Sequence, residues 1–379
     1  MEKIINKVCN IVIDTSYKNF TPSVYEFNNK NIKNSSKSNI NEIYDEVLII
    51  SDENVYNHQL DNFINSIKSN MVYEYIVPSG EDSKSLSVYE EIIKYCIRIN
   101  LSRKSLIIAL GGGVVGDLAG FIASTYMRGI DVCQIPTSLL AQVDSSVGGK
   151  TGINIGNLKN IIGTFYQPKF TYINIDALKT LPHNEFISGM AEVIKYSIIY
   201  DYDFLGYIID NSENILNKDN ETLHYIGKKC IEIKADIVSK DEKEGGLRKI
   251  LNFGHTFGHG VEKICKISHG EAVSVGMHMA FKLSLEKGYI DKTYYNQFIK
   301  ACNKFNLPLM FNIFLDQQEV TEDKKDNINK EILEIMKNDK KNSFGKINLI
   351  LPIDFGKVEI IDNIDEDEIL NIIKGVNHA

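Results

Sequence analysis

The chain lacks the cysteine pairs that hold structural zinc or form a disulfide framework. Its six cysteines are scattered over 379 residues without a CxxC motif, which favours a reducing compartment. It has no apolar run long enough to cross a membrane, and its N-terminal residues show no signal-peptide pattern. From these absences we expect a cytoplasmic protein without a membrane segment or a disulfide scaffold.

Positive charge is also scarce. Lysine and arginine number 42 against 50 aspartates and glutamates, for a net charge of -8. This balance argues against nucleic-acid binding, which needs a basic surface. An anionic substrate would therefore need a local cluster of cations. The 43% hydrophobic and 24% charged residues are typical of a globular protein, and the length fits about two domains.

The order of apolar patterns predicts the fold class. Strand patterns at 46–51, 72–77, 105–110, 132–136 and 170–175 alternate with helical patterns such as that at 85–99. This alternation predicts an α/β domain with a parallel, Rossmann-like sheet over residues 1–181. The patterns then become helical, with one late strand at 346–351, and predict a mainly helical domain over 182–379. Polar stretches at 28–42 and 316–330 are expected at the surface.

A glycine-rich motif follows the strand pattern at 105–110. Gly111-Gly-Gly-Val-Val-Gly116 fits GxGxxG, in which glycines let the backbone approach a pyrophosphate and a helix N-terminus donates N–H groups. The alternative is a tight turn without a ligand. Segments 52–54 and 80–84 follow two other strand patterns. Because ligands of open α/β sheets lie beyond the carboxyl ends of the strands, we expect both to contact a ribose and base.

The segment from Asp144 to Asn160 is polar and rich in glycine, and we expect a loop. Its Gly-Lys-Thr sequence at 149–151 is similar to the end of a Walker A motif, but Asp144 stands where that motif requires its first glycine. A nucleoside triphosphatase is therefore excluded. Lys150, Lys159 and Asn160 suit an anionic group such as a phosphate; the alternative is a plain surface loop.

A polar stripe stands where an apolar one is usual. Arg248, Asn252, His255 and His259 are spaced 4, 3 and 4 apart, which on a helix is a single face. The glycines at 254 and 258 would each cost about 1 kcal/mol inside that helix, a cost usually tolerated where something must pack closely.

Glu192 lies on a predicted helix over 182–199, with Ser188 and Lys195 on the same side. A glutamate with two histidines and one open position is the pattern of a catalytic zinc-like site. Spacing alone does not decide which two of His255, His259 and His269 would bind the metal. His255 and His259, at i and i+4 on one helix, are the simplest pair of ligands. Histidines satisfied within a core are the alternative. Lys234 falls in a helical run, where a buried cation implies an anionic partner, and the charge run 241–244 is interpreted as solvated.

These residues together resemble the 3-dehydroquinate synthase family. The motifs that carry the resemblance are the segments Gly111–Asp117, Tyr126–Gly129, Ile135–Asn154, Gly189–Tyr196, Asn252–His259 and His269–Val273. They follow one another in order, and further matches lie near 52–54, 81–84 and 340–341, so the resemblance covers most of the chain.

The resemblance implies a homodimer whose first domain binds NAD and whose second binds one divalent metal, zinc or cobalt. Its substrate would be a small sugar phosphate, 3-deoxy-D-arabino-heptulosonate 7-phosphate. Transient oxidation by NAD, phosphate elimination, re-reduction and an intramolecular aldol closure would give 3-dehydroquinate, in the shikimate pathway to the aromatic amino acids.

Individual roles also follow from the resemblance. The metal ligands would be Glu192, His255 and His269, and proton transfer would fall to His259 and Glu244, which revises the solvated interpretation of the charge run. Phosphate would be bound by Lys150, Asn160 and, from the other subunit, Arg128, while Lys234 and Arg248 would bind a carboxylate. The remaining substrate contacts would be Asp144, Lys195, Asn252 and one of Lys340 or Lys341, with Lys150 and Asn252 also counted as catalytic. Nucleotide contacts would be Asp52, Asn54, Glu81, Lys84, Gly112, Gly113, Val114, Asp117, Thr137, Ser138 and Lys159.

Three other interpretations stay open from the residues. A related sugar-phosphate cyclase would share the metal and NAD motifs but change the carboxylate-binding residues. A metal-dependent polyol dehydrogenase would need no phosphate pocket, which the set Lys150, Asn160 and Arg128 disfavours. A non-catalytic module that binds NAD and metal is disfavoured because every ligand and proton carrier is present.

Overall fold

The internal contacts divide the chain into two units. The computed structural model describes residues 1–5, 9–29, 39–156, 158–318, 320–338 and 347–377. Unit 1 comprises Met1–Phe186 and Asn220–Lys243, and unit 2 comprises Ile187–Asp219 and Glu244–Ala379. The predicted boundary at 181 stays a prediction. The contacts differ from it in assigning to unit 1 a helix that follows the boundary, α9 (Asn220–Lys240).

Unit 1 is built on a seven-stranded sheet with the order β1-β2-β9-β6-β5-β3-β4. Every neighbouring pair is parallel except β1 and β2. The predicted α/β fold with a parallel sheet is confirmed, and the five predicted strands match to within one residue at each end; β1 and β2 were not predicted. The strands are β1 (Glu2–Ile5), β2 (Asn10–Asp14), β3 (Val47–Asp52), β4 (Val72–Val77), β5 (Leu106–Gly111), β6 (Asp131–Pro136) and β9 (Phe170–Asn174).

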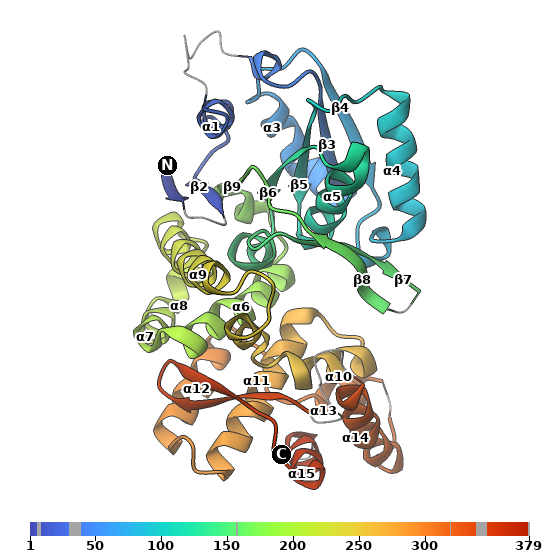
Figure 1. The fold of residues 1–379 in the computed structure, drawn as a ribbon. Helices are drawn as coiled ribbons and strands as arrows, with labels where there is room; N and C mark the ends of the chain where they lie inside the picture. The colour runs from blue at the N-terminus through green and yellow to red at the C-terminus, as the bar shows by residue number, and fades with distance from the viewer. Residues whose placement is uncertain (6–8, 30–38, 157, 319, 339–346, 378–379) are drawn as a thin grey trace. The chain divides into compact units, whose positions relative to one another are not determined.

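Both faces of this sheet are covered, which explains why its strands have continuous apolar runs. On β3, Val47 and Ile49 point to one core cluster, and Leu48 and Ile50 point to the other. Figure 1 shows α1 (Phe20–Phe27) and α3 (Asp61–Ile64) on the first face and α4 (Leu86–Arg98) and α5 (Gly113–Thr125) on the second. The strand period of two therefore matches two helical layers.

The strand order places a switch point between β3 and β5. After β3 the chain moves outward to β4, then returns past β3 to β5 and continues to β6 and β9. The connections on the two sides of this point leave toward opposite faces of the sheet. In open α/β sheets a ligand is expected at such a point, beyond the carboxyl ends of the strands, here β3 and β5. The glycine motif begins at the end of β5, and Asp52 ends β3.

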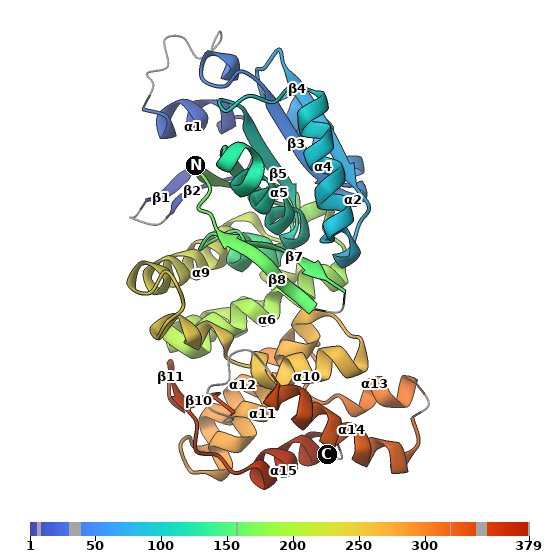
Figure 2. The same cartoon turned by 45° about the vertical axis from the view of Figure 1, so that its right-hand side comes forward.

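The loop predicted over 144–160 is wrong for most of its length. A single π-helical turn (Ala141–Ser145) leads into an antiparallel hairpin of β7 (Lys150–Ile155) and β8 (Leu158–Phe165). Figure 2 shows this hairpin beside α5. Glycine allows the close approach, because a Cβ on Gly120 of α5 would lie 2.5 Å from Thr151 Cγ2. The hairpin therefore packs closely against α5 through Thr151 of β7.

Unit 2 is mainly helical, as predicted. The late strand is β10 (Leu349–Asp354), but it pairs with β11 (Lys357–Ile361), which was not predicted. The surface interpretation of 316–330 is wrong for Lys325 and Asn329, which are buried on α14. No helix in the described part of the chain is both long and apolar enough to cross a bilayer. The helices are α6 (His183–Tyr200, which begins in unit 1), α7 (Tyr202–Asp210), α8 (Ser212–Leu216), α10 (His255–Cys265), α11 (His269–Glu286), α12 (Lys292–Lys304), α13 (Asn312–Gln317), α14 (Glu322–Lys337) and α15 (Glu366–Asn377).

Candidate functional site

Three potential metal ligands meet in unit 2, each from a different helix. Glu192 lies in the middle of α6, His255 begins α10 and His269 begins α11. Their ligand atoms all lie within 4.8 Å of one another. Glu192 Oε1 is 3.1 Å from Nε2 of His269 and 3.4 Å from Nε2 of His255. The spacing left the choice of histidines open, and the structure groups 255 and 269 with the glutamate.

Backbone contacts between helices bring these ligands together. A Cβ on Gly258 of α10 would lie 2.8 Å from the carbonyl oxygen of Ala272 on α11, and one on Gly276 of α11 would collide with the carbonyl oxygen of Gly254. Where α11 approaches α6, the backbone N–H of Gly270 donates to Ser188 Oγ at 3.1 Å. The expectation that glycine marks a close approach in this segment is therefore confirmed.

The single helical face predicted for residues 248–259 is wrong. A 3₁₀ helix (Leu247–Asn252) carries Arg248 and Asn252, and α10 begins only at His255. Gly254, which precedes α10, has a φ of +79°, in the left-handed region that favours glycine. The break turns the carbonyl of Phe253 toward His255, whose Nδ1 lies 3.0 Å from that oxygen.

Burial and charge act in opposite directions on this cluster. Glu192 is fully buried and forms an ion pair with Lys195, which is also buried. Burial opposes the ionisation of Glu192, but Lys195 and the histidines hold its pKa well below the ordinary value. Burial lowers the pKa of His255 to about 4. For His269, hydrogen bonds to Glu192 and Glu262 outweigh burial and raise the pKa to about 9.

The donor set fits a divalent metal such as zinc. Carboxylate and imidazole donors bind zinc at about 2.0–2.1 Å in tetrahedral geometry, which separates neighbouring donor atoms by roughly 3.3 Å. The observed separations of 3.1 and 3.4 Å agree with that value. Three protein ligands leave a fourth position for substrate or water, as in catalytic sites.

Both predicted proton carriers and two of the predicted substrate contacts, Arg248 and Asn252, lie in the same unit. Asn252 Nδ2 donates to Glu244 Oε1 at 2.7 Å, so the two predicted residues hold each other. His259 lies one turn after His255, with 5.6 Å between the ring centroids. Arg248 is 1% exposed, and a guanidinium this buried needs anionic or carbonyl partners.

In unit 1, the glycine motif lies at the switch point. Gly112 is the N-cap residue of α5 and offers no side-chain cap, so the first N–H groups of the helix face outward from the loop. The N–H of Thr137 donates to the carbonyl oxygen of Gly111 at 3.0 Å, and a Cβ on Gly112 would lie 3.5 Å from Ser138 Oγ. The structure thus brings together the nucleotide contacts predicted after β5 and after β6.

A buried lysine links the other predicted nucleotide contacts. Lys84 is 3% exposed, and its Nζ donates to Asp117 Oδ2 at 2.7 Å and to Asn160 Oδ1 at 2.6 Å. Its distance to Glu81 Oε1 is 3.7 Å. Burial raises the pKa of Asp117, and Lys84 opposes that shift. Because Asn160 Oδ1 accepts from Lys84, the side-chain nitrogen of Asn160 is the atom that could donate to a ligand.

Asn154 completes this network; it ends one of the motifs that carry the resemblance, but no role was predicted for it. Its Nδ2 donates to Glu81 Oε1 at 2.9 Å, and its Oδ1 accepts the N–H of Asn160 at 2.8 Å. Glu81 is far from Asn154 along the chain, so no local pattern could have revealed the contact.

Two further predicted residues pair with each other. Lys234 of α9 forms an ion pair with the carboxylate of Asp144 and also donates to its carbonyl oxygen at 2.6 Å. The anionic partner that burial of Lys234 requires is thus present in unit 1. At the end of β3, Asp52 Oδ1 accepts the N–H groups of Asn54 and Val55, which begins the short helix α2 (Glu53–Val55).

The structure does not bring Arg128 to Asn160 within one copy. Asn160 lies beside Asp117 at the start of α5, whereas Arg128 follows the end of that helix, about 16 Å away at 1.5 Å per residue. Lys150 and Lys159 are exposed on the hairpin. Lys340 and Lys341 lie outside the described residues.

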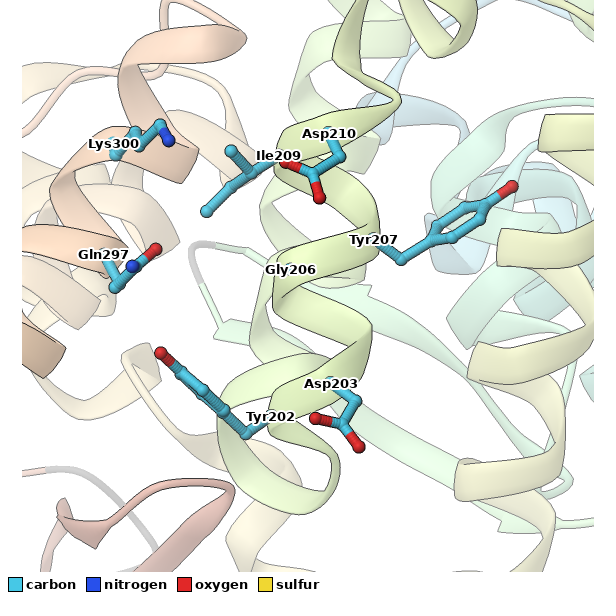
Figure 3. Close-up of a pocket in the computed structure, with 8 residues that line it drawn as sticks. All are labelled: Tyr202, Asp203, Gly206, Tyr207, Ile209, Asp210, Gln297 and Lys300. Carbon is cyan, nitrogen blue, oxygen red and sulfur yellow. The ribbon is translucent and has the colours of Figure 1, made fainter.

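A separate pocket of about 340 Å³ lies between α7 and α12. In Figure 3, Tyr202 and Ile209 of α7 point toward α12, while Asp203 and Tyr207 point away from it. None of the predicted site residues lines this pocket. Charges of both signs surround it, from Asp210 and Lys300 among others, and this mixture selects no ligand class.

Known proteins resemble the chain in sequence and fold. The family model described as 3-dehydroquinate synthase N-terminal matches residues 74–188, and the C-terminal model of the same family matches residues 189–342. The 3-dehydroquinate synthase of Alkaliphilus metalliredigens (strain QYMF) is 46% identical over 318 residues, which cover 83% of this chain and 86% of the relative.

Two solved structures share the fold. The 2-epi-5-epi-valiolone synthase of Streptomyces hygroscopicus subsp. jinggangensis 5008, with NAD+ and Zn2+ bound, has a TM-score of 0.80 at 19% identity and covers 99% of this chain and 98% of its own. A 2-deoxy-scyllo-inosose synthase complexed with carbaglucose-6-phosphate, NAD+ and Co2+ has a TM-score of 0.81 at 23% identity and covers 99% of both chains.

Proposed function

The chain belongs to the 3-dehydroquinate synthase family, and we propose that it converts 3-deoxy-D-arabino-heptulosonate 7-phosphate to 3-dehydroquinate and inorganic phosphate, a carbon–oxygen lyase reaction. The observation that carries the proposal is the cluster of Glu192, His255 and His269 within a chain 46% identical to a relative with that activity in its name. No net redox change is expected, because the hydride removed early is returned later.

We assign an NAD site to unit 1 and a divalent metal site to unit 2. The outward N–H groups at the start of α5 and the glycines before them suit a pyrophosphate. NAD, when bound, would take up a hydride from the ring carbon that carries a hydroxyl, while the hydroxyl proton leaves separately, and would later return that hydride. The three ligands of unit 2 would hold the metal, which as a Lewis acid polarises hydroxyl and ketone oxygens. Two fold relatives bind NAD+ together with Zn2+ or Co2+.

The residues around these groups would bind the substrate and move protons. Arg248 provides a buried guanidinium for a carboxylate, since it can bind both oxygens at once. Asn252 holds the Glu244 carboxylate at 2.7 Å, which orients it as a proton carrier. His259, one turn from a metal ligand, would act as the second carrier. Lys195 keeps Glu192 ionised, as a metal ligand must be.

We further propose that the protein is a homodimer in which Arg128 reaches the phosphate site of its partner. Within one copy, Arg128 lies at the far end of α5 from Asn160. Tyr166, which follows β8, donates to the carbonyl oxygen of Ile130 at 2.9 Å, so Arg128 adjoins the hairpin. The hairpin also exposes several large apolar residues, each 36–55% exposed: Ile155, Leu158, Ile161, Ile162 and Phe165. Exposed apolar clusters of this kind mark protein interfaces.

Mixing two inactive variants tests the dimer. In a heterodimer one copy carries Arg128→Ala and the other carries His259→Ala. If Arg128 acts in its partner's site, one of the two sites is intact and the other has both defects; if it acts in its own copy, each site has one defect. If Arg128 acts across the interface, random mixing restores about a quarter of wild-type activity. No restoration, with heterodimers shown by mass spectrometry, would place Arg128 in its own copy's site.

The activity is tested by measuring phosphate release from the heptulosonate phosphate with NAD and zinc, while NADH absorbance is followed in the same cuvette. We expect phosphate without accumulating NADH, and no phosphate after chelation of the metal. Steady NADH formation from a polyol without phosphate release would support a dehydrogenase instead. Phosphate released only from another sugar phosphate would support a related cyclase.

A further inference from the structure

Glu262 lies beside the metal ligands without being one of them. It is on α10, two turns after His255, and its side chain is 16% exposed. Its Oε2 lies 3.5 Å from Nδ1 of His269, while Nε2 of the same ring faces Glu192 Oε1 at 3.1 Å. The imidazole of His269 is therefore held between two carboxylates, one at each ring nitrogen.

The other two ligands are supported in the same way. His255 has its Nδ1 3.0 Å from the carbonyl oxygen of Phe253, which leaves its Nε2 toward Glu192. Glu192 has its second oxygen in an ion pair with Lys195. Each ligand thus presents one atom to the cluster and has another atom tied to a fixed neighbour. Such outer contacts fix the tautomer and the ring orientation of a ligand.

The support of His269 differs from that of His255 in its charge and its origin. The Phe253 carbonyl is neutral and follows from the backbone turn at Gly254. Glu262 is an ionisable side chain that can be replaced without changing the course of the backbone. It also connects two helices, because its own helix is α10 and His269 begins α11.

We propose that Glu262 is a positioning residue that accepts the Nδ1–H of His269 and so directs the Nε2 lone pair of that ring to the metal. A carboxylate in this position also increases the basicity of the imidazole and hence its strength as a ligand. The proposal rests on the metal site in the proposed function and adds a residue to it. Glu262 would contact neither the metal nor the substrate.

The test measures zinc affinity without substrate, by competition with a chromophoric chelator. We expect Glu262→Ala to weaken zinc binding by on the order of 10–100-fold, and Glu262→Gln to weaken it less, because an amide oxygen still accepts the proton. Glu286→Gln is the matched control, since Glu286 is an exposed carboxylate on α11. That control should keep the wild-type affinity.

Two further readouts separate positioning from a general structural role. The melting temperature of the zinc-free protein should be the same for wild type and Glu262→Gln, while the increase that zinc produces should be smaller in the variant. Because the basicity and orientation of the imidazole set the ligand field, the cobalt-loaded Glu262→Gln should also show a shifted visible absorption spectrum.

The outcomes distinguish this inference from the function on which it rests. If wild type binds no zinc, the metal part of the proposed function fails, and this inference fails with it. If wild type binds zinc and both Glu262 variants bind it equally well, only the role of Glu262 is overturned. If Glu262→Gln loses zinc affinity and its zinc-free form also melts at a lower temperature than zinc-free wild type, the inference is likewise overturned, in favour of a packing role.

Discussion

The two units build their candidate sites from different kinds of structure. In unit 1, the predicted nucleotide contacts lie in loops after parallel strands and on a hairpin, and several, such as Asn54 and Lys159, are exposed. In unit 2, the predicted metal ligands come from three helices, and Glu192 is fully buried. The nucleotide site of unit 1 depends on where the strands end, and the metal site of unit 2 depends on how closely the helix backbones approach one another.

This difference follows from the ligands that each site would bind. A dinucleotide makes many individually weak contacts along its length, so its site tolerates small displacements of any one loop. A metal needs each donor placed to within about 0.2 Å, so its ligands belong on elements held by backbone contacts. Glycines serve both sites, but in unit 1 they admit the ligand, whereas in unit 2 they admit another helix. Three substitutions test that contrast, in order of decreasing expected effect, and a fourth, outside both sites, has the smallest effect.

The largest effect is expected from Glu192→Ala. This change removes a metal ligand and deprives the buried Lys195 of its carboxylate, which should cost about 3–5 kcal/mol in free energy of unfolding. Hydrogen exchange of the α6 amides measures this local loss. The double variant Glu192→Ala with Lys195→Met should regain part of the stability but no zinc binding. A single variant as stable as wild type would contradict the importance of the pair.

Gly276→Ala should cost about 3 kcal/mol in unit 2. The added Cβ would collide with the carbonyl oxygen of Gly254, which would separate α10 from α11 and with them the two histidine ligands. We expect faster hydrogen exchange in both helices together with weaker zinc binding. Gly206→Ala on α7 is the control, because nothing lies within 4 Å of a Cβ there. That change should be neutral or slightly stabilising.

Gly112→Ala should affect ligand binding more than stability. Its Cβ would lie at an ordinary 3.5 Å from Ser138 Oγ, so the free energy of unfolding should change by about 1 kcal/mol or less. The methyl group would stand where a pyrophosphate approaches the backbone, and we expect NAD affinity to fall about tenfold. Calorimetric titration with NAD measures this. Unchanged affinity would show that the glycine motif is only a turn.

The smallest effect concerns His278, a buried residue of α11 outside both sites. Its Nδ1 donates to the carbonyl oxygen of Leu309 at 2.5 Å, and its Nε2 accepts from Tyr295 Oη at 2.7 Å. Burial lowers its pKa, and nearby Lys282 adds to that shift. Its contribution to stability is therefore complete above pH 6.5 and is lost as the pH falls through the folded-state pKa.

Replacing His278 with glutamine should therefore flatten the decrease in unfolding free energy between pH 7 and 5, by about 1 kcal/mol at most. Urea unfolding at several pH values measures this slope. His58→Gln, at an exposed histidine of unit 1, is the control and should leave the slope unchanged. Parallel slopes for wild type and His278→Gln would show that other groups cause the acid sensitivity.

The sequence predicted best where local periodicity and tertiary environment agree. Strands β3, β5 and β6 are buried on both faces, so their continuous apolar runs alone identified them. Prediction failed for β7 and β8, where glycines and polar residues interrupt the apolar ones and hide the strand pattern. It also failed at Gly254, where a left-handed residue splits an apparent helical face into two elements.

By itself, the sequence determined five strands of the main sheet, the change to a mainly helical second part and the residue types available for chemistry, because these depend on local patterns. The tertiary structure decided which of those residues meet. His269 lies 77 residues from Glu192 along the chain, yet its Nε2 lies 3.1 Å from the carboxylate. Local patterns carry no information about such a contact, since it arises only when glycines allow α10, α11 and α6 to approach one another.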